Sequence, residues 1–251
     1  MKLTEAQYAE ISECFPKHRR KASISNLEIL NAVLYVLENG CKWRCLPKEY
    51  GNWNTIYVRL RRWSKSGVLQ RAFLLLQEKN IIQVSVKIIS LDSTSIKVHP
   101  DGTGAFKKHG KQAIGNSRGG RNTKLHMVAA SDRDAVTFFL SSGEAGDAPQ
   151  GRKLLSTLGN TSRQVYLLMD RAYEGNATRD LASQMGYIPV VPPKSNRKNP
   201  WVYDKSLYKV RNQVERLFRR IKRFRRIFTR YDKLDIMFVT FIFLALVADA
   251  L

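Results

Sequence analysis

The segment YKVRNQVERLFRRIK, residues 208–222, guides the interpretation of the whole chain of 251 residues. On a helix that turns about 100° per residue, the apolar residues of this segment and its continuation form one stripe. The stripe consists of Val210, Val214, Leu217, Phe218, Ile221, Phe224 and Phe228. Four polar side chains fall within a sector of about 60° beside it: Tyr208, Arg211, Glu215 and Lys222. The pattern predicts a helix with a buried apolar face and a lone carboxylate among cations at its edge.

Two interpretations of that edge are open. In the first, the helix has a solvated basic face, and Arg211 and Glu215 form one i,i+4 salt bridge. In the second, the carboxylate belongs to a site that needs further acids from elsewhere in the chain. The second interpretation predicts that aspartates upstream of the helix complete the site.

The charge balance points to a polyanionic partner. Lys and Arg number 43 and Asp and Glu 21, a net charge of +22, while 43% hydrophobic residues are enough for a folded core. Nucleic acid is the expected partner and an anionic membrane the alternative. The N-terminal residues show no apolar signal segment, and the apolar run 236–248 is too short to span a bilayer. Three cysteines, an odd number, fit a reduced cytoplasmic protein.

Residues 1–82 are expected to form an all-helical domain. Capping and apolar patterns predict helices near residues 4–14, 26–39 and 68–79, and a further helix that begins at Asn52 or Asn54 and runs through Ser64. In chain order, this further helix is the third of the four. It would direct four cations outward: Arg59, Arg61, Arg62 and Lys65. A short helix, a turn and a basic helix are typical of a helix-turn-helix DNA reader. A domain that serves only for packing is the alternative.

Residues 83–251 are expected to form a mixed α/β domain. Strands are predicted at 86–98, 124–130, 136–141, 165–169 and 187–191, and helices at 148–158, 177–185 and 234–250 in addition to the basic helix. Three successive strands followed by alternating helices and strands indicate an antiparallel meander continued by parallel crossovers. Residues 99–123 are predicted to be a long basic loop. Its Arg118 and Arg121 could follow a phosphate backbone, or the loop could be only a flexible connection.

Two upstream aspartates and Glu215 are the candidate site. Asp92 interrupts an apolar strand, where a carboxylate is costly unless something compensates it. Asp170 follows another apolar strand, a position that α/β folds use for functional groups. Three carboxylates brought together would repel one another and need a cation, and two Mg²⁺ or Mn²⁺ ions would suit phosphodiester chemistry.

Each acid also has an ordinary interpretation. Asp170 could cap a helix or pair with Arg171, and Asp92 could begin a turn. Three further acids could replace one of the chosen three: Glu144, Asp147 and Glu174.

Three blocks in order resemble the signatures of the IS4/IS5 group of bacterial DDE transposases. They are LDSTSIKVH (residues 91–99), LLMDRAYEG (residues 167–175) and the pattern Y-x2-R-x3-E-x6-K (residues 208–222). The stretch LPKEYGNWNTIYVRLRRW (residues 46–63) also looks like the usual front end of IS5-type members. The resemblance implies a ribonuclease H-like fold for residues 83–251. It also implies a metal-binding triad of Asp92, Asp170 and Glu215, with Tyr208, Arg211 and Lys222 holding DNA near the scissile phosphate.

The same resemblance implies a function. The chain would bind the terminal inverted repeats of an insertion sequence, cleave the ends and join the 3′-hydroxyls to target double-stranded DNA. A homodimer or larger assembly on DNA, and a cytoplasmic, nucleoid-associated bacterial location, would follow. The alternatives are a basic nucleic-acid-binding protein without activity and a ribonuclease H-like nuclease without strand transfer.

Overall fold

Contacts divide the computed structural model, which describes residues 1–17 and 23–251, into two units. The helical unit contains residues 1–82, 98–112 and 221–251, and the sheet unit contains residues 83–97 and 113–220. The division thus differs from a single boundary at residue 83. The reason is that two later segments, the last of them largely apolar helix, pack with the N-terminal helices.

The helical unit confirms the all-helical prediction for the N-terminal part. Its elements are α1 (Glu5–Ala9), α2 (Asn26–Asn39), α3 (Trp53–Ser66), α4 (Val68–Glu78), α9 (Arg225–Phe228), β7 (Thr229–Arg230) and α10 (Asp235–Ala250). Thr4 and Ser25 form capping boxes at the starts of α1 and α2. Gly40 and Gly67 end α2 and α3 with left-handed φ angles of 65° and 68°. Local sequence therefore sets these helix ends.

The connection between α2 and α3 is longer than the turn of a helix-turn-helix motif, which has three or four residues. Residues 40–52 contain two 3₁₀ turns, Trp43–Cys45 and Lys48–Tyr50. Helix α10 contacts α2, α3 and α4 and is buried along most of its length. In the described part of the chain, no helix combines the length and the hydropathy that crossing a bilayer would require.

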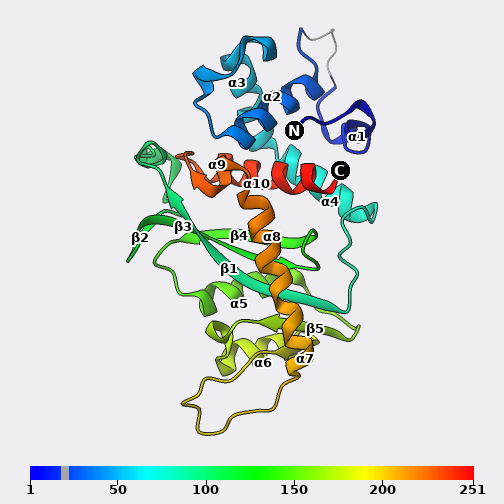
Figure 1. Ribbon diagram of the computed structural model, residues 1–251, viewed down its shortest axis with the longest axis vertical. Coiled ribbons are helices and arrows are strands. Elements are labelled where there is room, and N and C mark those ends of the chain that lie inside the picture. Colours follow the sequence, from blue (N-terminus) through cyan, green and yellow to red (C-terminus); the bar gives the residue numbers. More distant parts are fainter. Residues whose placement is uncertain (18–22) are drawn as a thin grey trace. The chain divides into compact units, whose positions relative to one another are not determined.

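The sheet unit contains a mixed sheet, with antiparallel and parallel strand pairs (Figure 1). Its strands are β1 (Ile88–Val98), β2 (Gly115–Ser117), β3 (Gly120–Ala129), β4 (Ala135–Ser142), β5 (Val165–Met169) and β6 (Tyr187–Val190). Strand β3 pairs antiparallel with β1, β2 and β4, whereas β1 with β5 and β5 with β6 pair in parallel. Helices α5 (Asp147–Leu158) and α6 (Asn176–Gln184) connect the later strands. The predicted meander and crossovers are both present.

Three sequence predictions are wrong in detail. Residues 115–122 form a β-hairpin instead of continuing the predicted loop, because Asn116 pairs with Arg121 and Ser117 with Gly120. The apolar stripe is buried only in its middle, since Val210 and Phe228 at its ends are 37% and 64% exposed. The helix itself is divided into α7 (Lys205–Tyr208), a 3₁₀ turn (Lys209–Arg211) and α8 (Asn212–Lys222).

The two faces of the sheet are covered by different helices. Ile89 and Leu91 of β1 lie in the core formed with α5 and α6. Between them, Ser90 accepts a hydrogen bond from Gln213 Nε2 of α8 at 3.1 Å. Successive side chains of a strand point to opposite faces, so Asp92 follows Ser90 on the face covered by α8 (Figure 1).

Candidate functional site

Strand register brings Asp92 and Asp170 together. Leu91 of β1 pairs in parallel with Met169 of β5, and the two aspartates are the residues that directly follow this last pair. Adjacent strands lie about 4.8 Å apart. Strand β5 ends at Met169, and Asp170 Oδ1 accepts a hydrogen bond from the Arg171 amide at 2.6 Å, capping a 3₁₀ turn. Asp170 therefore acts as a cap and still lies beside Asp92.

Arg211 links Glu215 to Asp92. Its Nη1 donates to Asp92 Oδ2 at 2.9 Å and its Nη2 to Glu215 Oε1 at 2.6 Å. The i,i+4 salt bridge expected from the helix pattern is thus present, and the same guanidinium reaches a carboxylate 119 positions earlier in the chain. The side chains of Asp92 and Arg211 are only 16% and 17% exposed. This near-buried ion pair places the helix acid next to the strand acids.

The three acids are close enough for the charges of Asp170 and Glu215 to affect the pKa of Asp92. The pKa of Asp92 is raised to about 6, chiefly by burial, and the negative charges of Asp170 and Glu215 add to the rise. The Ser93 amide and the Arg211 guanidinium oppose it without cancelling it. A cluster of carboxylates with a single close cation favours binding of further positive charge.

A hard divalent ion fits the chemistry of these donors. Three carboxylates offer oxygen ligands, which Mg²⁺ and Mn²⁺ prefer. Among residues 1–17 and 23–251, no three His, Cys, Asp or Glu side chains are placed to share one ion. Arg211 stands between Asp92 and Glu215. An ion could take both carboxylates only if Arg211 gave up at least one of them.

Tyr208, the last residue of α7, joins this cluster. The Arg211 guanidinium lies 5.7 Å from the centre of its ring, within the range of a cation–π contact. Burial raises the pKa of Tyr208, and the Asp170 charge adds to that rise. Lys222, the fourth residue of the pattern, ends α8 and belongs to the helical unit, where burial lowers its pKa.

The three alternative acids, Glu144, Asp147 and Glu174, lie outside the carboxylate cluster. Asp147 Oδ1 accepts hydrogen bonds from Ser93 Oγ at 2.8 Å and Lys124 Nζ at 3.0 Å. Ser93 follows Asp92, so it points to the opposite face of β1. Glu174 forms salt bridges with Arg197 at 2.7 Å and Lys194 at 3.4 Å.

Glu144, the last of these alternative acids, is exposed and lies against Gly115, where a Cβ atom would collide with its carboxylate. The structure therefore groups Asp92 with Asp170 and Glu215 rather than with any of these acids.

Tyr173 was missed by sequence reasoning. Its side chain is 1% exposed and packs against Gly151 of α5, where a Cβ would come within 2.5 Å of the ring. Burial raises the pKa of Tyr173 far above its ordinary value, and the charges of Asp92, Asp147 and Asp170 raise it further. Tyr173 lies three residues after Asp170, inside the LLMDRAYEG block, and this position is the feature of the sequence that marks it as part of the site.

The predicted DNA-binding cations of α3 differ in exposure. Arg61, Arg62 and Lys65 are exposed, on the side of α3 away from its buried residues. Arg59 is partly buried and donates from Nη1 to Asn26 Oδ1 at 3.1 Å. Three of the four are therefore available to a partner without rearrangement.

The other two predicted cations are in the sheet unit. Arg118 lies in the turn of the β2–β3 hairpin and Arg121 on β3, and both are exposed. The hairpin presents them from a defined strand pair rather than from a flexible connection.

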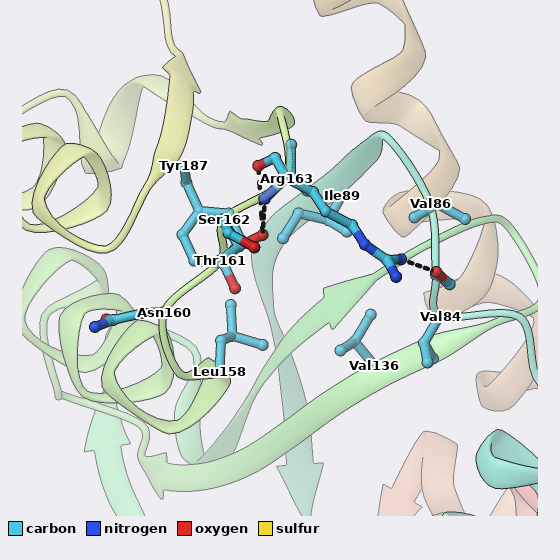
Figure 2. A pocket seen from close by; sticks show the side chains of 12 residues that line it. Val84, Val86, Ile89, Val136, Leu158, Asn160, Thr161, Ser162, Arg163 and Tyr187 are labelled. Carbon is cyan, nitrogen blue, oxygen red and sulfur yellow. Dashed lines mark hydrogen bonds between the residues drawn. The ribbon is translucent and has the colours of Figure 1, made fainter.

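A separate cavity of about 460 Å³ lies at the opposite ends of the parallel strands (Figure 2). It is lined by Ile89 near the start of β1 and Val165 at the start of β5, whereas Asp170 follows the end of β5. Arg163, labelled in Figure 2, lines the cavity and donates from Nη1 to Ser85 Oγ at 2.6 Å. This cavity is not part of the carboxylate cluster.

Two family models match the chain. Residues 86–249 match the family described as "Transposase DDE domain". Residues 3–73 match the family described as "Putative transposase of IS4/5 family". Together the two matches cover both the N-terminal helices and the segment that carries the three acids.

Curated relatives include short insertion-sequence proteins. A Brucella ovis protein, "Putative transposase for insertion sequence element IS6501", is 32% identical over 124 residues, which are 49% of this chain and 93% of that protein. A Burkholderia cepacia protein, "Insertion element IS402 uncharacterized 16.2 kDa protein", is 34% identical over 105 residues, covering 38% of this chain and 69% of that protein.

Solved structures similar to this one are distant. The piggyBac transposase synaptic complex with hairpin DNA has a TM-score of 0.40 at 12% identity, over 76% of this chain and 47% of that chain. The Mos1 transposase paired-end complex has a TM-score of 0.30 at 13% identity, over 85% of this chain and 81% of that chain.

Proposed function

Because this chain belongs to the family of transposases with a DDE domain, we propose that it cleaves the ends of an insertion sequence and joins the 3′-hydroxyls to target DNA. One observation carries the proposal. Asp92 and Asp170 directly follow Leu91 and Met169, the last pair of the parallel strands β1 and β5, and Arg211 ties Glu215 to Asp92. Carboxylates so placed suit metal-dependent phosphoryl transfer better than a passive basic surface does.

Asp92, Asp170 and Glu215 would hold two Mg²⁺ or Mn²⁺ ions. Such ions, when bound, supply the positive charge that activates a water or a 3′-hydroxyl and stabilises the leaving oxygen of a phosphodiester. The protein itself presents the three carboxylates from strand β1, from the residue after β5 and from helix α8, so that their geometry depends on the sheet and on the helix packed against it.

Tyr208, Arg211 and Lys222 would hold the DNA end. A guanidinium released from a carboxylate can grip a phosphate with two parallel hydrogen bonds, and Arg211 is already oriented by Tyr208. Exposed cations on α3 and the β2–β3 hairpin would contact the phosphate backbone, which fixes orientation without reading sequence. They are Arg61, Arg62, Lys65, Arg118 and Arg121, with Arg59 held closer to the core.

The partners would be double-stranded DNA at the terminal inverted repeats and at the target, bound by a homodimer or larger assembly. Two ends must be cut together, which a monomer with one carboxylate cluster does not readily achieve. The protein would act in the cytoplasm of a bacterium, associated with the nucleoid, to which a net charge of +22 would bind it.

The test is incubation of the protein with labelled DNA carrying the element's ends, with Mg²⁺ or with EDTA. Cleavage with joining supports the proposal, cleavage alone indicates a nuclease without strand transfer, and binding without products indicates a DNA-binding protein.

Asp92→Asn and Asp147→Asn are matched variants for this experiment. Asp92→Asn should lower cleavage by orders of magnitude and leave end binding intact, because it removes one metal-binding charge at constant shape. Asp147→Asn should cleave normally, since Asp147 pairs with Lys124 on the other face of the sheet. If Asp147→Asn lost cleavage and Asp92→Asn kept it, Asp147 rather than Asp92 would belong to the site.

A further inference from the structure

A second cavity, of about 350 Å³, lies entirely within the helical unit. Its volume falls in the range of small-molecule sites, roughly 300–1,000 Å³. Aromatic side chains from three separate segments line it: Trp43 before α3, Tyr57 on α3, Phe106 in the loop before β2 and Tyr231 before α10. None of these four aromatic residues belongs to the carboxylate cluster.

The floor of this cavity is rigid. Arg226 is 5% exposed and donates to both Asp232 oxygens, at 3.2 and 3.0 Å, and to the Cys41 carbonyl at 3.2 Å. Its guanidinium lies 5.6 Å from the Trp43 ring centre and 5.8 Å from that of Tyr231. Trp43 also contacts Tyr57 edge-on, with ring centres 5.3 Å apart. The aromatic walls are thus fixed before any ligand arrives.

The rim is basic and carries an exposed aromatic ring. Arg61 and Lys233 line the cavity and are exposed. Phe106 is 72% exposed, and Gly104 and Gly110, with φ angles of 74° and 73°, flank it in the loop. Lys108 Nζ lies 5.7 Å from the centre of the Phe106 ring, so the ring is exposed beside cations, where it can stack on a planar partner.

We propose that this cavity accepts an unstacked nucleobase, with Phe106 stacking on it and the rim cations holding the adjacent phosphates. That the nucleobase belongs to a nucleic-acid strand rests on the proposed function. A planar aromatic heterocycle suits walls made of rings, and a polyanionic strand suits Arg61 and Lys233. Asp101, which also lines the cavity, supplies a carboxylate to accept a hydrogen bond from an N–H group of a base, such as N3–H of thymine.

The test compares two single-stranded oligomers of equal charge. One is an oligothymidylate of about ten nucleotides, within the site sizes known for single-strand binders, and the other is an abasic oligomer with the same phosphates. Affinities of the full chain are measured by fluorescence anisotropy at several salt concentrations. Stacking of one base should make the protein prefer the oligothymidylate by at least about fivefold.

Two phenylalanine variants make the result specific. Phe106→Ala should abolish this preference and leave affinity for the abasic oligomer unchanged. Phe228→Ala is the control, because Phe228 is also exposed, at 64%, and lies in the same unit outside the lining of this cavity. Lys233→Ala should instead weaken binding of both oligomers equally. It should also reduce the slope of log affinity against log salt concentration by about 0.7, the value for one phosphate of a single strand.

Equal binding of the two oligomers by the wild-type chain would overturn the proposal. So would a Phe106→Ala protein that keeps the preference. The measurement needs no cleavage, so it can fail while end cleavage succeeds. The Asp92→Asn protein should retain the base preference, which separates this inference from the proposed activity.

Discussion

At the scale of single residues, Arg211 determines the state of the carboxylate cluster. It is the cation that joins Asp92 to Glu215, and both partners raise its pKa more than its own burial lowers it. The pair with Asp92 is nearly buried, so removing one member leaves a charge without its partner. A guanidinium in that position also competes with any ion that needs the same oxygens.

Arg211→Gln should therefore have opposite effects without and with metal. Without metal, unfolding should cost about 1–3 kcal/mol less free energy, because the Asp92 carboxylate loses its charged donor. Adding Mn²⁺ should then raise the melting temperature more in this variant than in the wild type, since no guanidinium has to be displaced. Thermal melting with and without Mn²⁺ measures both effects.

Arg216→Gln on the same helix is the matched control. Arg216 pairs with Asp132 at 3.3 Å, and both side chains are about half exposed. Its loss should cost at most about 1 kcal/mol and leave the Mn²⁺ effect unchanged. An equal response to Mn²⁺ in Arg211→Gln and wild type would mean that the ion binds elsewhere.

His126 on β3 links stability to pH. Burial lowers its pKa to about 4, and its ring stacks on Phe139 while Nε2 lies 2.8 Å from Ser141 Oγ. The unfolded chain takes up the proton near pH 6.5, whereas the folded chain resists it. Stability is therefore complete above pH 6.5 and falls as pH drops toward 4, by up to about 3 kcal/mol.

Denaturant unfolding of wild type and His126→Phe between pH 7 and pH 4 tests this contribution. The slope of unfolding free energy against pH should be smaller in the variant, because only the wild type carries this proton uptake. Parallel slopes would show that the remaining carboxylates account for all of the acid sensitivity.

At the scale of elements, the contact of α5 with the turn after β5 positions Asp170, which caps that turn. Tyr173 belongs to the 3₁₀ turn that Asp170 caps, and its ring lies on Gly151 in the middle of α5. Leu91 of β1 also lies close to that glycine. A helix glycine at this position lets the ring, the strand and the helix approach one another closely.

Gly151→Ala should destabilise the protein, even though alanine is the better helix former by about 1 kcal/mol. The new methyl group would lie 2.5 Å and 2.7 Å from two ring carbons of Tyr173, so the ring or the helix must shift. Overpacking of this kind costs about 1–3 kcal/mol. Denaturant unfolding gives the change in stability.

Gly119→Ala, whose Cβ would have its nearest neighbour at 3.9 Å, serves as the control and should change stability little. A Gly151→Ala protein as stable as wild type would show that Tyr173 can move freely. In that case it could not hold the turn at Asp170 in place.

At the scale of the whole molecule, the helical unit is assembled from segments far apart in the chain. Residues 98–112 and 221–251 fold with residues 1–82. Helix α10 contributes a nearly continuous buried surface to α2, α3 and α4. The N-terminal helices therefore share their core with the end of the chain.

A fragment of residues 1–82 should fail to fold stably when expressed alone. Without α10, apolar side chains of α2, α3 and α4 would face water, and each fully exposed large side chain costs about 1.5–3 kcal/mol. Circular dichroism and thermal melting of the fragment should show reduced helicity and no cooperative transition. A cooperative transition like that of the full chain would show that these helices form an independent domain, and DNA binding by them alone could then be tested directly.

The sequence by itself determined the local features of this protein. The 3.6-residue pattern predicted the basic helix and the Arg211–Glu215 pair, and capping residues predicted where α1 and α2 begin. The order of strands and helices predicted the mixed sheet. These features depend on residues within a few positions of one another, so one segment of sequence contains the information.

Tertiary structure alone decided the rest. The register between β1 and β5 places Asp92 beside Asp170, and Asp147 pairs instead with Ser93 and Lys124. The second partner of Arg211, the place of Tyr173 on Gly151 and the grouping of α10 with the N-terminal helices also arise between distant segments. Such contacts are chosen by the packing of whole surfaces, which no local pattern encodes.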